Sequence, residues 1–338
     1  MSIASKFSSV GMYVPPKVVE NKDLEQMMDT SDEWIRQRTG IERRHWAEIT
    51  DCTSDFALRA SQEAIQKAGI ENDEIDMILL ATLSPDHDFP GTACFLQAKL
   101  GVSGIPAIDI RQQCSGFLYG MSIADNFIKS GQYKNILLVG AELHSKGLNR
   151  TPAGRDVAVL FGDGAGAAVI SATEVSDSKT DSHILASQLH SDGHFAKELW
   201  MPAPGTGFQY KDRMDRAMFD DDVIWPKMNG KTVFVHATKK MGEVLVETLK
   251  RAQAQPDEVD LFIFHQANLR INDKVAEMLK VPSEKVFNTI HNYGNTTAAT
   301  IPIGLYEAEK QGILKPGMLV ASAAFGSGFT WASSVYRW

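Results

Sequence analysis

The sequence has few cysteines and no long apolar segment. Its 338 residues include only three cysteines, Cys52, Cys94 and Cys114, and none of them lies in a CxxC pair. So few cysteines argue against a disulfide framework and a structural zinc site, and they favour a reducing compartment. No apolar run approaches the ~20 residues that span a bilayer, and the N-terminus lacks the apolar core of a secretory signal. We therefore expect a cytoplasmic protein without a membrane partner.

Positive charge is outnumbered by negative charge, since 34 Lys and Arg residues against 42 Asp and Glu residues give a formal net charge of −8. An acidic balance of this size disfavours nucleic acid as a partner. The segment 34–46 departs from the average, since it holds four arginines between Trp34 and Trp46. Two interpretations are open here: a solvated helix end, or a site for an anionic ligand that carries an aromatic group.

The sequence does contain the alternating pattern of a layered α/β fold. Its length predicts two domains or one large duplicated domain, and a hydrophobic content of 43% is enough for a sizeable core. Residues 55–70 have apolar positions at helical spacing, and three short apolar runs are typical of buried strands, at residues 76–84, 135–142 and 166–172. Strands that alternate with helices predict a layered α/β architecture.

The second half of the chain repeats the first. Residues 72–80 resemble residues 256–264 at an offset of 184, and Gly131 matches Gly312 at an offset of 181. A net loss of three residues in a connecting loop explains the change of offset. The chain is therefore predicted to contain an internal duplication.

The duplication relates three chemically capable residues. The offset of 181 relates Cys114 to Asn295, and the offset of 184 relates Ala81 to His265. All three side chains are expected at strand ends or helix starts, and a pseudo-twofold axis would bring the two helix starts together at the centre of the molecule.

Each of the three residues has an ordinary structural interpretation when taken alone. Cys114 precedes an apolar, buried helix, and a helix N-terminus favours the thiolate over the usual thiol pKa of about 8.5. A buried cysteine is nevertheless more often structural. His265 directly follows an apolar strand at residues 261–264, and Asn295 lies in a YGNTT turn. A lone histidine or turn asparagine at such a place is usually structural as well.

Together the three side chains point to acyl chemistry. A cysteine can hold an acyl group as a thioester. An imidazole and a carboxamide can both donate hydrogen bonds to a thioester carbonyl that becomes an enolate when CO2 is lost. The backbone amides of Cys114 and of Ser327 in the FGSG turn are candidates for a second oxyanion hole.

At these residues the sequence resembles the thiolase-fold condensing enzymes, and within them the β-ketoacyl-acyl-carrier-protein synthase III family. The resemblance runs nearly end to end through the motifs TSDEWIRQRTGIERRH, CSGF, FGDGAGAAVI, LHSDG, HQANLRI, GNTTAATIP and FGSGFTW. It implies a thiolase-like α/β fold with two pseudo-twofold-related halves in αβαβα layers. Residues 1–172 would carry the nucleophilic cysteine, and residues 173–338 would carry the histidine and the asparagine.

The resemblance also implies the reaction and the partners. Cys114 would accept an acyl group from coenzyme A, and His265 and Asn295 would assist decarboxylation of a malonyl thioester on acyl carrier protein. The product would be a β-ketoacyl thioester that initiates fatty acid synthesis. The enzyme would be a homodimer without a metal or redox cofactor, with acyl-coenzyme A as a substrate.

Further residues are assigned to recognition by the same resemblance. Trp34 would stack on the adenine of coenzyme A opposite Arg155, Arg38 would contact the nucleotide phosphates, and Thr30 would lie nearby. Arg270 would contact the carrier protein.

The sequence departs from the common family pattern at several places. Residues 111–113, Arg-Gln-Gln, precede the cysteine where small alanines are common, and Glu277 and Met278 replace a frequent Lys-Lys pair at the carrier-protein surface. The segment 199–229 is longer than in the shorter members. The motifs DHD and HSDGH contain possible metal ligands but have no established metal spacing.

The length of the acyl primer has two competing indications. Phe89 matches a family loop whose aromatic residue reaches the acyl pocket of the partner subunit. A phenyl ring there predicts a short primer, acetyl to about butyryl, because it fills the volume of several methylenes. The longer segment 199–229 and the unusual residues 111–113 could open another route for a longer chain.

Two other functions remain open from the sequence. A related thiolase-fold acyltransferase or condensing enzyme of secondary metabolism would use a longer primer or an acceptor other than acyl carrier protein. A catalytically idle scaffold protein is a different class, and three chemically competent residues argue against it.

Overall fold

Two β-sheets form the framework of the molecule, for which a computed structural model describes residues 2–207 and 209–338. The first sheet has the strand order β1 (Ser2–Tyr13), β7 (Gly164–Val175), β6 (Asn135–Glu142), β4 (Met77–Ala81), β5 (Ala107–Ile110). The second sheet has the order β8 (His183–Ser191), β13 (Thr330–Arg337), β12 (Leu319–Gly326), β11 (Leu261–Phe264).

The two sheets repeat the same strand directions. In the first sheet β1 and β6 are antiparallel to β7, and β4 is parallel to β6. In the second sheet β8 and β12 are antiparallel to β13, and β11 is parallel to β12. This repetition agrees with the internal duplication in the sequence. The predicted division after residue 172 stays a prediction, with β7 ending at Val175 and β8 beginning at His183.

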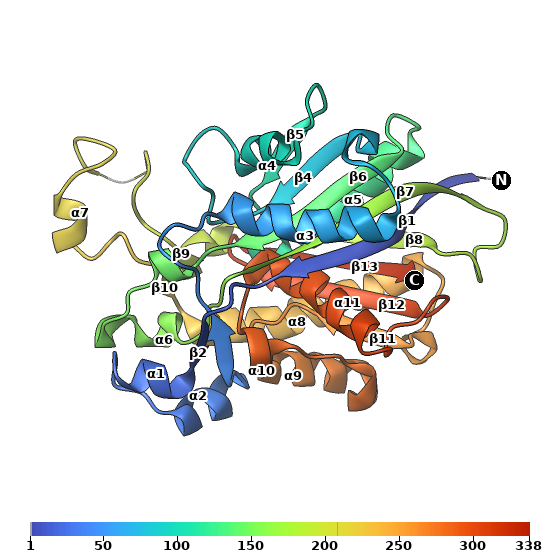
Figure 1. The fold of residues 1–338 in the computed structure, drawn as a ribbon. Helices are drawn as coiled ribbons and strands as arrows, with labels where there is room; N and C mark the ends of the chain where they lie inside the picture. The colour runs from blue at the N-terminus through green and yellow to red at the C-terminus, as the bar shows by residue number, and fades with distance from the viewer. Residues whose placement is uncertain (1, 208) are drawn as a thin grey trace.

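Helices cover both sheets and separate them. The central layer contains α5 (Gly116–Lys129) and α11 (Thr300–Lys310), while α3 (Thr53–Ala68) and α4 (Thr92–Leu100) cover the first sheet and α8 (Gly230–Arg251) and α9 (Leu269–Leu279) cover the second (Figure 1). The predicted αβαβα layers are therefore confirmed. Because helices lie on both faces, the inner strands are apolar throughout, as in β6, where seven of eight residues are buried.

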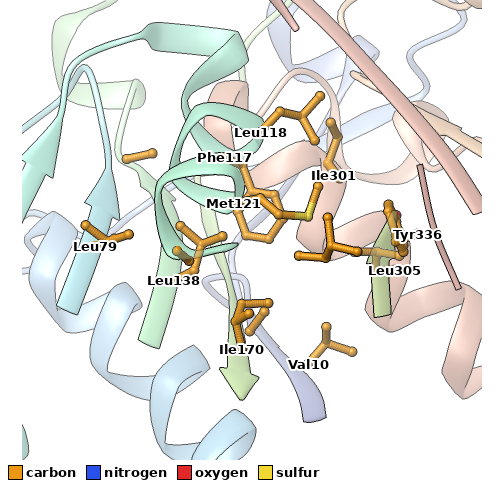
Figure 2. Packing of buried hydrophobic residues seen from close by; sticks show 14 of the residues in the cluster. Val10, Leu79, Phe117, Leu118, Met121, Leu138, Ile170, Ile301, Leu305 and Tyr336 are labelled. Atoms are coloured by element: carbon orange, nitrogen blue, oxygen red, sulfur yellow. The ribbon is translucent and has the colours of Figure 1, made fainter. Parts of the chain in front are cut away.

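The main core lies around α5. Figure 2 shows Phe117 and Met121 of this helix among side chains from both sheets and from α11, including Leu138 and Tyr336. These side chains are fully buried, and each stabilises the fold by about 1.5–3 kcal/mol. This packing fixes the start of α5, which directly follows the turn that holds Cys114, relative to the start of α11.

Shorter elements complete the chain. These are β2 (Val18–Glu20), α1 (Asn21–Glu25), α2 (Asp32–Thr39), β3 (Arg43–His45), η2 (Gln113–Ser115), α6 (Arg155–Ala158), β9 (Leu199–Trp200), α7 (Ala217–Asp220), β10 (Lys227–Met228), α10 (Ile290–Tyr293) and η8 (Thr297–Ala299), with further single 3-10 turns. The segment around α7 extends away from the body, at the left of Figure 1. Within the described ranges, no helix combines the length and apolarity that crossing a membrane requires.

Candidate active site

A cleft of about 500 Å³ brings the three candidate catalytic residues together. Cys114, His265 and Asn295 all line it, although they come from η2, from the end of β11 and from the turn before η8. The expected meeting of the helix starts at the centre of the molecule is thus observed. All three residues are buried, with exposed fractions of 8%, 2% and 4% respectively.

Cys114 lies in η2, immediately before α5, in a closely packed turn. The preceding Gln113 has φ 43°, a left-handed conformation that costs a non-glycine residue of order 1–3 kcal/mol. On the other side, a Cβ on Gly326 would lie only 3.1 Å from the Cys114 sulfur, so only glycine lets the FGSG turn come this close. The strained residue and the glycine together hold the sulfur against backbone amides.

The Cys114 thiol is less acidic than the sequence suggests. Burial, and then the nearby Glu142 carboxylate, raise the pKa of Cys114 to about 12, while the backbone amides of Cys114 and Ser327 lower it. The expectation that the helix N-terminus favours the thiolate is therefore wrong, because desolvation raises the pKa of Cys114 by more than the backbone groups lower it. The proximity of the Ser327 amide does agree with the predicted second oxyanion hole.

His265 faces the cleft with one nitrogen and the protein with the other. Its Nδ1 lies 2.7 Å from the Thr300 hydroxyl, and its Nε2 is buried with no hydrogen-bond partner among the described residues. Burial lowers the pKa of His265 to about 3, so the ring is neutral at pH 7. A neutral ring with a free nitrogen in the cleft can offer one hydrogen bond to a substrate.

Asn295 is held by its backbone and by one end of its carboxamide. Its N–H donates to the Leu160 carbonyl at 2.9 Å, and its carbonyl accepts from the Gly162 amide at 3.1 Å. The side-chain Oδ1 accepts the backbone N–H of Thr297 at 2.8 Å. A Cβ on Gly162 would lie 2.3 Å from the Tyr293 carbonyl, so this glycine of the FGDGAG motif allows close backbone packing.

The open end of the cleft carries the basic and aromatic residues. Trp34 and Arg38 line it, and the guanidinium carbons of Arg38 and Arg155 lie 4.5 Å and 4.6 Å from the centre of the Trp34 ring. Arg44, by contrast, is fully buried and donates to Asn21, Val19 and Val159. The buried Arg44 therefore fits neither interpretation of the arginine-rich segment, and a site for an anionic ligand at Trp34 and Arg38 stays a prediction.

The predicted recognition residues occupy three different settings. The hydroxyl of Thr30 is buried without a partner among the described residues. Arg270 lines the cleft beside Phe234, with 5.5 Å between its guanidinium carbon and the ring centre. Phe89 is 80% exposed and is not part of the wall of its own chain's cleft.

Sequence reasoning missed two buried polar residues beside the catalytic centre. Glu142 accepts hydrogen bonds from Thr82, Leu83 and Ser84, and burial raises its pKa to about 8. His144 binds the Thr297 hydroxyl at 2.6 Å. The one sequence feature that could have indicated a buried polar group here is Glu142, a glutamate at the end of an apolar strand. Among the described residues there is no cluster of three or more potential metal ligands.

The layers and the placement of the cysteine together characterise a class of protein. Two sheets of like order enclose two helices, and a cysteine precedes one of those helices at the wall of a cleft; this is the arrangement of the thiolase-fold condensing enzymes. The fold class expected from the sequence is thereby confirmed.

Comparisons with known proteins define the family more closely. The family models described as 3-oxoacyl-[acyl-carrier-protein] synthase III and its C-terminal part match residues 108–193 and 249–338. The chain is 45% identical over 329 residues to a β-ketoacyl-[acyl-carrier-protein] synthase III from Geobacillus kaustophilus, covering 97% of each protein. The corresponding protein of Caldanaerobacter subterraneus is 42% identical, with 99% of this chain and 98% of that protein covered.

A solved structure agrees with these relatives. The crystal structure of 3-oxoacyl-[acyl-carrier-protein] synthase III from Aquifex aeolicus matches with a TM-score of 0.88 and 42% identity, covering 99% of this chain and 100% of that one. The chain belongs to the 3-oxoacyl-[acyl-carrier-protein] synthase III family. The resemblance in the sequence is confirmed, and with it the assignment as an acyltransferase-type condensing enzyme.

Proposed function

We propose that the protein catalyses the decarboxylative Claisen condensation of an acyl-coenzyme A primer with malonyl-acyl carrier protein, the step that initiates fatty acid synthesis. The observation that carries the proposal is the convergence of Cys114, His265 and Asn295 on one cleft. The nucleophile and two hydrogen-bonding side chains then surround a single reaction site.

The reaction uses the three residues in two stages. The Cys114 sulfur attacks the acyl thioester, and coenzyme A leaves as its thiol with the proton that Cys114 loses, while the amides of Cys114 and Ser327 stabilise the oxyanion. The malonyl thioester then loses CO2, and His265 and Asn295 donate hydrogen bonds to the enolate oxygen. The enolate carbon attacks the acyl-cysteine, which releases the β-ketoacyl thioester and restores Cys114. This scheme requires no metal or redox cofactor.

Coenzyme A binding requires a rearrangement at the open end of the cleft. The guanidinium carbon of Arg155 lies 4.6 Å from the centre of the Trp34 ring. An adenine between them needs roughly 3.5 Å on each side, so Arg155 must move outward to the far face of the adenine. Arg38 would then contact the phosphates of coenzyme A, and Thr30 would contact one of its polar groups. Arg270 would contact the carrier protein at the same opening.

Homodimer formation is proposed through β5. This strand pairs with β4 and has no second partner within the described chain, and its residue Ile108 is 42% exposed. An open edge strand with an exposed apolar residue is suited to pairing with a second copy. Phe89 would then enter the partner's acyl pocket. We further propose a cytoplasmic enzyme with no nucleic-acid or membrane partner, which three free cysteines and the net charge of −8 support.

Two measurements test the proposed function. Mass spectrometry after incubation with acyl-coenzyme A thioesters of graded length should find the acyl group on Cys114. Labelled malonyl-acyl carrier protein should then release labelled CO2 only when the acylated protein is present. Transfer of the acyl group without any malonyl-dependent CO2 would favour a non-decarboxylating acyltransferase instead.

A further inference from the structure

One turn of the chain, residues 297–300, contacts both candidate hydrogen-bond donors of the cleft from behind. The Thr297 N–H donates to Asn295 Oδ1 at 2.8 Å, and the Thr300 hydroxyl lies 2.7 Å from His265 Nδ1. Both threonines are buried. These contacts involve the faces of the asparagine and the histidine that point away from substrate, so they determine which atoms remain for the cleft.

The backbone at Thr297 is held in an unfavourable conformation. Its φ is 49°, and the left-handed region is a clear outlier for a β-branched residue. Such strain persists only where surrounding contacts enforce it, and it clusters at functional sites. The enforcing contact is the bond of 2.6 Å between the Thr297 hydroxyl and His144 Nε2, and the His144 ring in turn packs on Phe161 at 4.6 Å.

The Thr300 hydroxyl has a single hydrogen and two acceptors within reach. His265 Nδ1 lies at 2.7 Å, and the Thr297 carbonyl lies at 3.0 Å but already accepts the Thr300 backbone N–H. The contact to Nδ1 is the shorter, and an oxygen donor typically makes bonds of ~2.7–2.8 Å. In the arrangement that we propose, the hydroxyl donates to Nδ1, the nearer of the two acceptors, and not to the Thr297 carbonyl. A neutral imidazole has one proton, which must then be on Nε2.

We propose that Thr297 and Thr300 are positioning residues that set His265 and Asn295 as two neutral hydrogen-bond donors before substrate binds. Thr300 fixes the tautomer of His265 with its proton on Nε2, in the cleft. Thr297 occupies Oδ1 of Asn295 and so turns the Nδ2 amide toward the cleft. The proposal deepens the proposed function, on which it rests, because an enolate oxygen needs donors and not acceptors.

The resting tautomer is measured first, on the unmodified protein without substrate. In protein labelled with 15N-histidine, the resonances of His265, assigned by comparison with His265→Ala, should show a protonated Nε2 and a bare Nδ1. A protonated Nδ1 in the resting enzyme would overturn the proposal. It would leave the proposed function standing as long as CO2 release is observed.

Variants at Thr300 then separate positioning from packing. Thr300→Val keeps the shape but removes the hydroxyl, so Nδ1–H becomes populated and malonyl decarboxylation should fall by roughly 10- to 100-fold, the range known for the orienting partners of metal-bound histidines. Acylation of Cys114 should stay nearly constant, and Thr300→Ser should restore both the tautomer and the rate. Thr248→Val is the matched control, because Thr248 is also buried and its hydroxyl donates to the Val244 carbonyl within α8. Equal losses of both half-reactions in Thr300→Val would contradict the proposal.

Asn295→Asp tests the second half of the proposal. Aspartate can still accept the Thr297 N–H, but its other oxygen cannot donate into the cleft. Decarboxylation should therefore fall as far as in Asn295→Ala. An aspartate variant that retains decarboxylation would show that Asn295 presents its oxygen to the substrate, and would overturn the assignment to Thr297.

Discussion

The two ends of the cleft differ in how their side chains are held in place. At the buried end, Cys114, His265 and Asn295 are each at most 8% exposed, and backbone or hydroxyl groups hold each of them at a defined distance. At the open end, Trp34 and Arg38 meet through a cation–π contact at 4.5 Å, a side-chain interaction worth roughly 0.5–1 kcal/mol at an exposed site. Under the proposed function, preorganisation is thus concentrated where charge develops, and recognition of coenzyme A falls to the side chains at the open end.

The largest expected effect is at the sulfur. Cys114→Ala should abolish acyl transfer and all condensation, because it removes the thiol that is proposed to accept the acyl chain. Loss of the acyl adduct in mass spectrometry and of β-ketoacyl product checks this, with gel filtration to show an unchanged folded state. Cys114→Ser should retain at most a trace, since a hydroxyl forms far less anion at neutral pH. Stable labelling of the alanine variant by acyl-coenzyme A would refute the assignment of the nucleophile.

The second effect concerns pH. Burial raises the pKa of Cys114 to about 12, so below that value the thiolate fraction rises roughly tenfold for each pH unit. Alkylation of Cys114 by iodoacetamide in the empty enzyme should therefore accelerate by about 10³ from pH 7 to pH 10, without a plateau. The exposed Cys94 is the internal control, and its alkylation is followed in the same peptide digest. A plateau for Cys114 near pH 7 would show that the helix N-terminus outweighs desolvation after all.

The third effect separates decarboxylation from acylation at the buried end of the cleft. His265→Ala and Asn295→Ala should slow malonyl decarboxylation by ~10²–10³ while self-acylation of Cys114 changes far less. Each substitution removes one donor to the enolate, whereas the amides that serve acylation remain. Separate single-turnover assays of acyl transfer and CO2 release measure the two half-reactions. If either variant lost both to the same degree, the division of labour between the amides and these two side chains would be wrong.

The fourth effect is confined to the open end. Trp34→Ala and Arg38→Ala should raise the KM for acyl-coenzyme A by about tenfold with a smaller change in kcat, because their contacts lie far from the reacting carbonyl. An acyl donor that lacks the nucleotide is the control and should be insensitive to both changes. Arg36→Ala is a matched variant, since Arg36 lies on the same helix but pairs with Glu42 at 2.9 Å. Equal sensitivity to both donors would mean that Trp34 and Arg38 act elsewhere.

The fold and the positions of the site residues could be predicted from the sequence, but the contacts that set their chemistry could not. The order of strands and helices follows from local periodicity, and the positions of Cys114, His265 and Asn295 follow from the duplication and the motifs. The contacts that set their chemistry do not, because they join distant segments: His144 and Thr297 are 153 residues apart, and His265 and Thr300 are 35 apart. The raised pKa of Cys114 was missed for a related reason, since burial depends on the whole fold and not on the helix that follows the cysteine.

The smallest expected effect concerns Phe89, which lies at neither end of its own cleft. The ring is 80% exposed in the single chain, a large apolar surface that a partner subunit would cover. Its neighbour Asp88 forms an ion pair with Arg213, which ties this loop to the segment 199–229. If Phe89 closes the partner's acyl pocket, the primer is short. Phe89→Thr should then shift the preference toward longer acyl-coenzyme A thioesters, by up to ~0.8 kcal/mol or about fourfold in kcat/KM for each methylene newly buried.

Competition between acetyl- and octanoyl-coenzyme A for acylation of Cys114 measures this shift. Phe219→Thr is the matched control, because Phe219 is also an exposed phenylalanine, at 66%, but lies on the protruding segment around α7. A shift in Phe89→Thr alone would place the gate at the loop of residues 85–90, whereas a shift in Phe219→Thr would assign it to the longer segment 199–229. If the unmodified protein already acylates faster from octanoyl-coenzyme A than from acetyl-coenzyme A, Phe89 is not the gate. The segment 199–229 or the residues 111–113 before the cysteine would then provide the longer route.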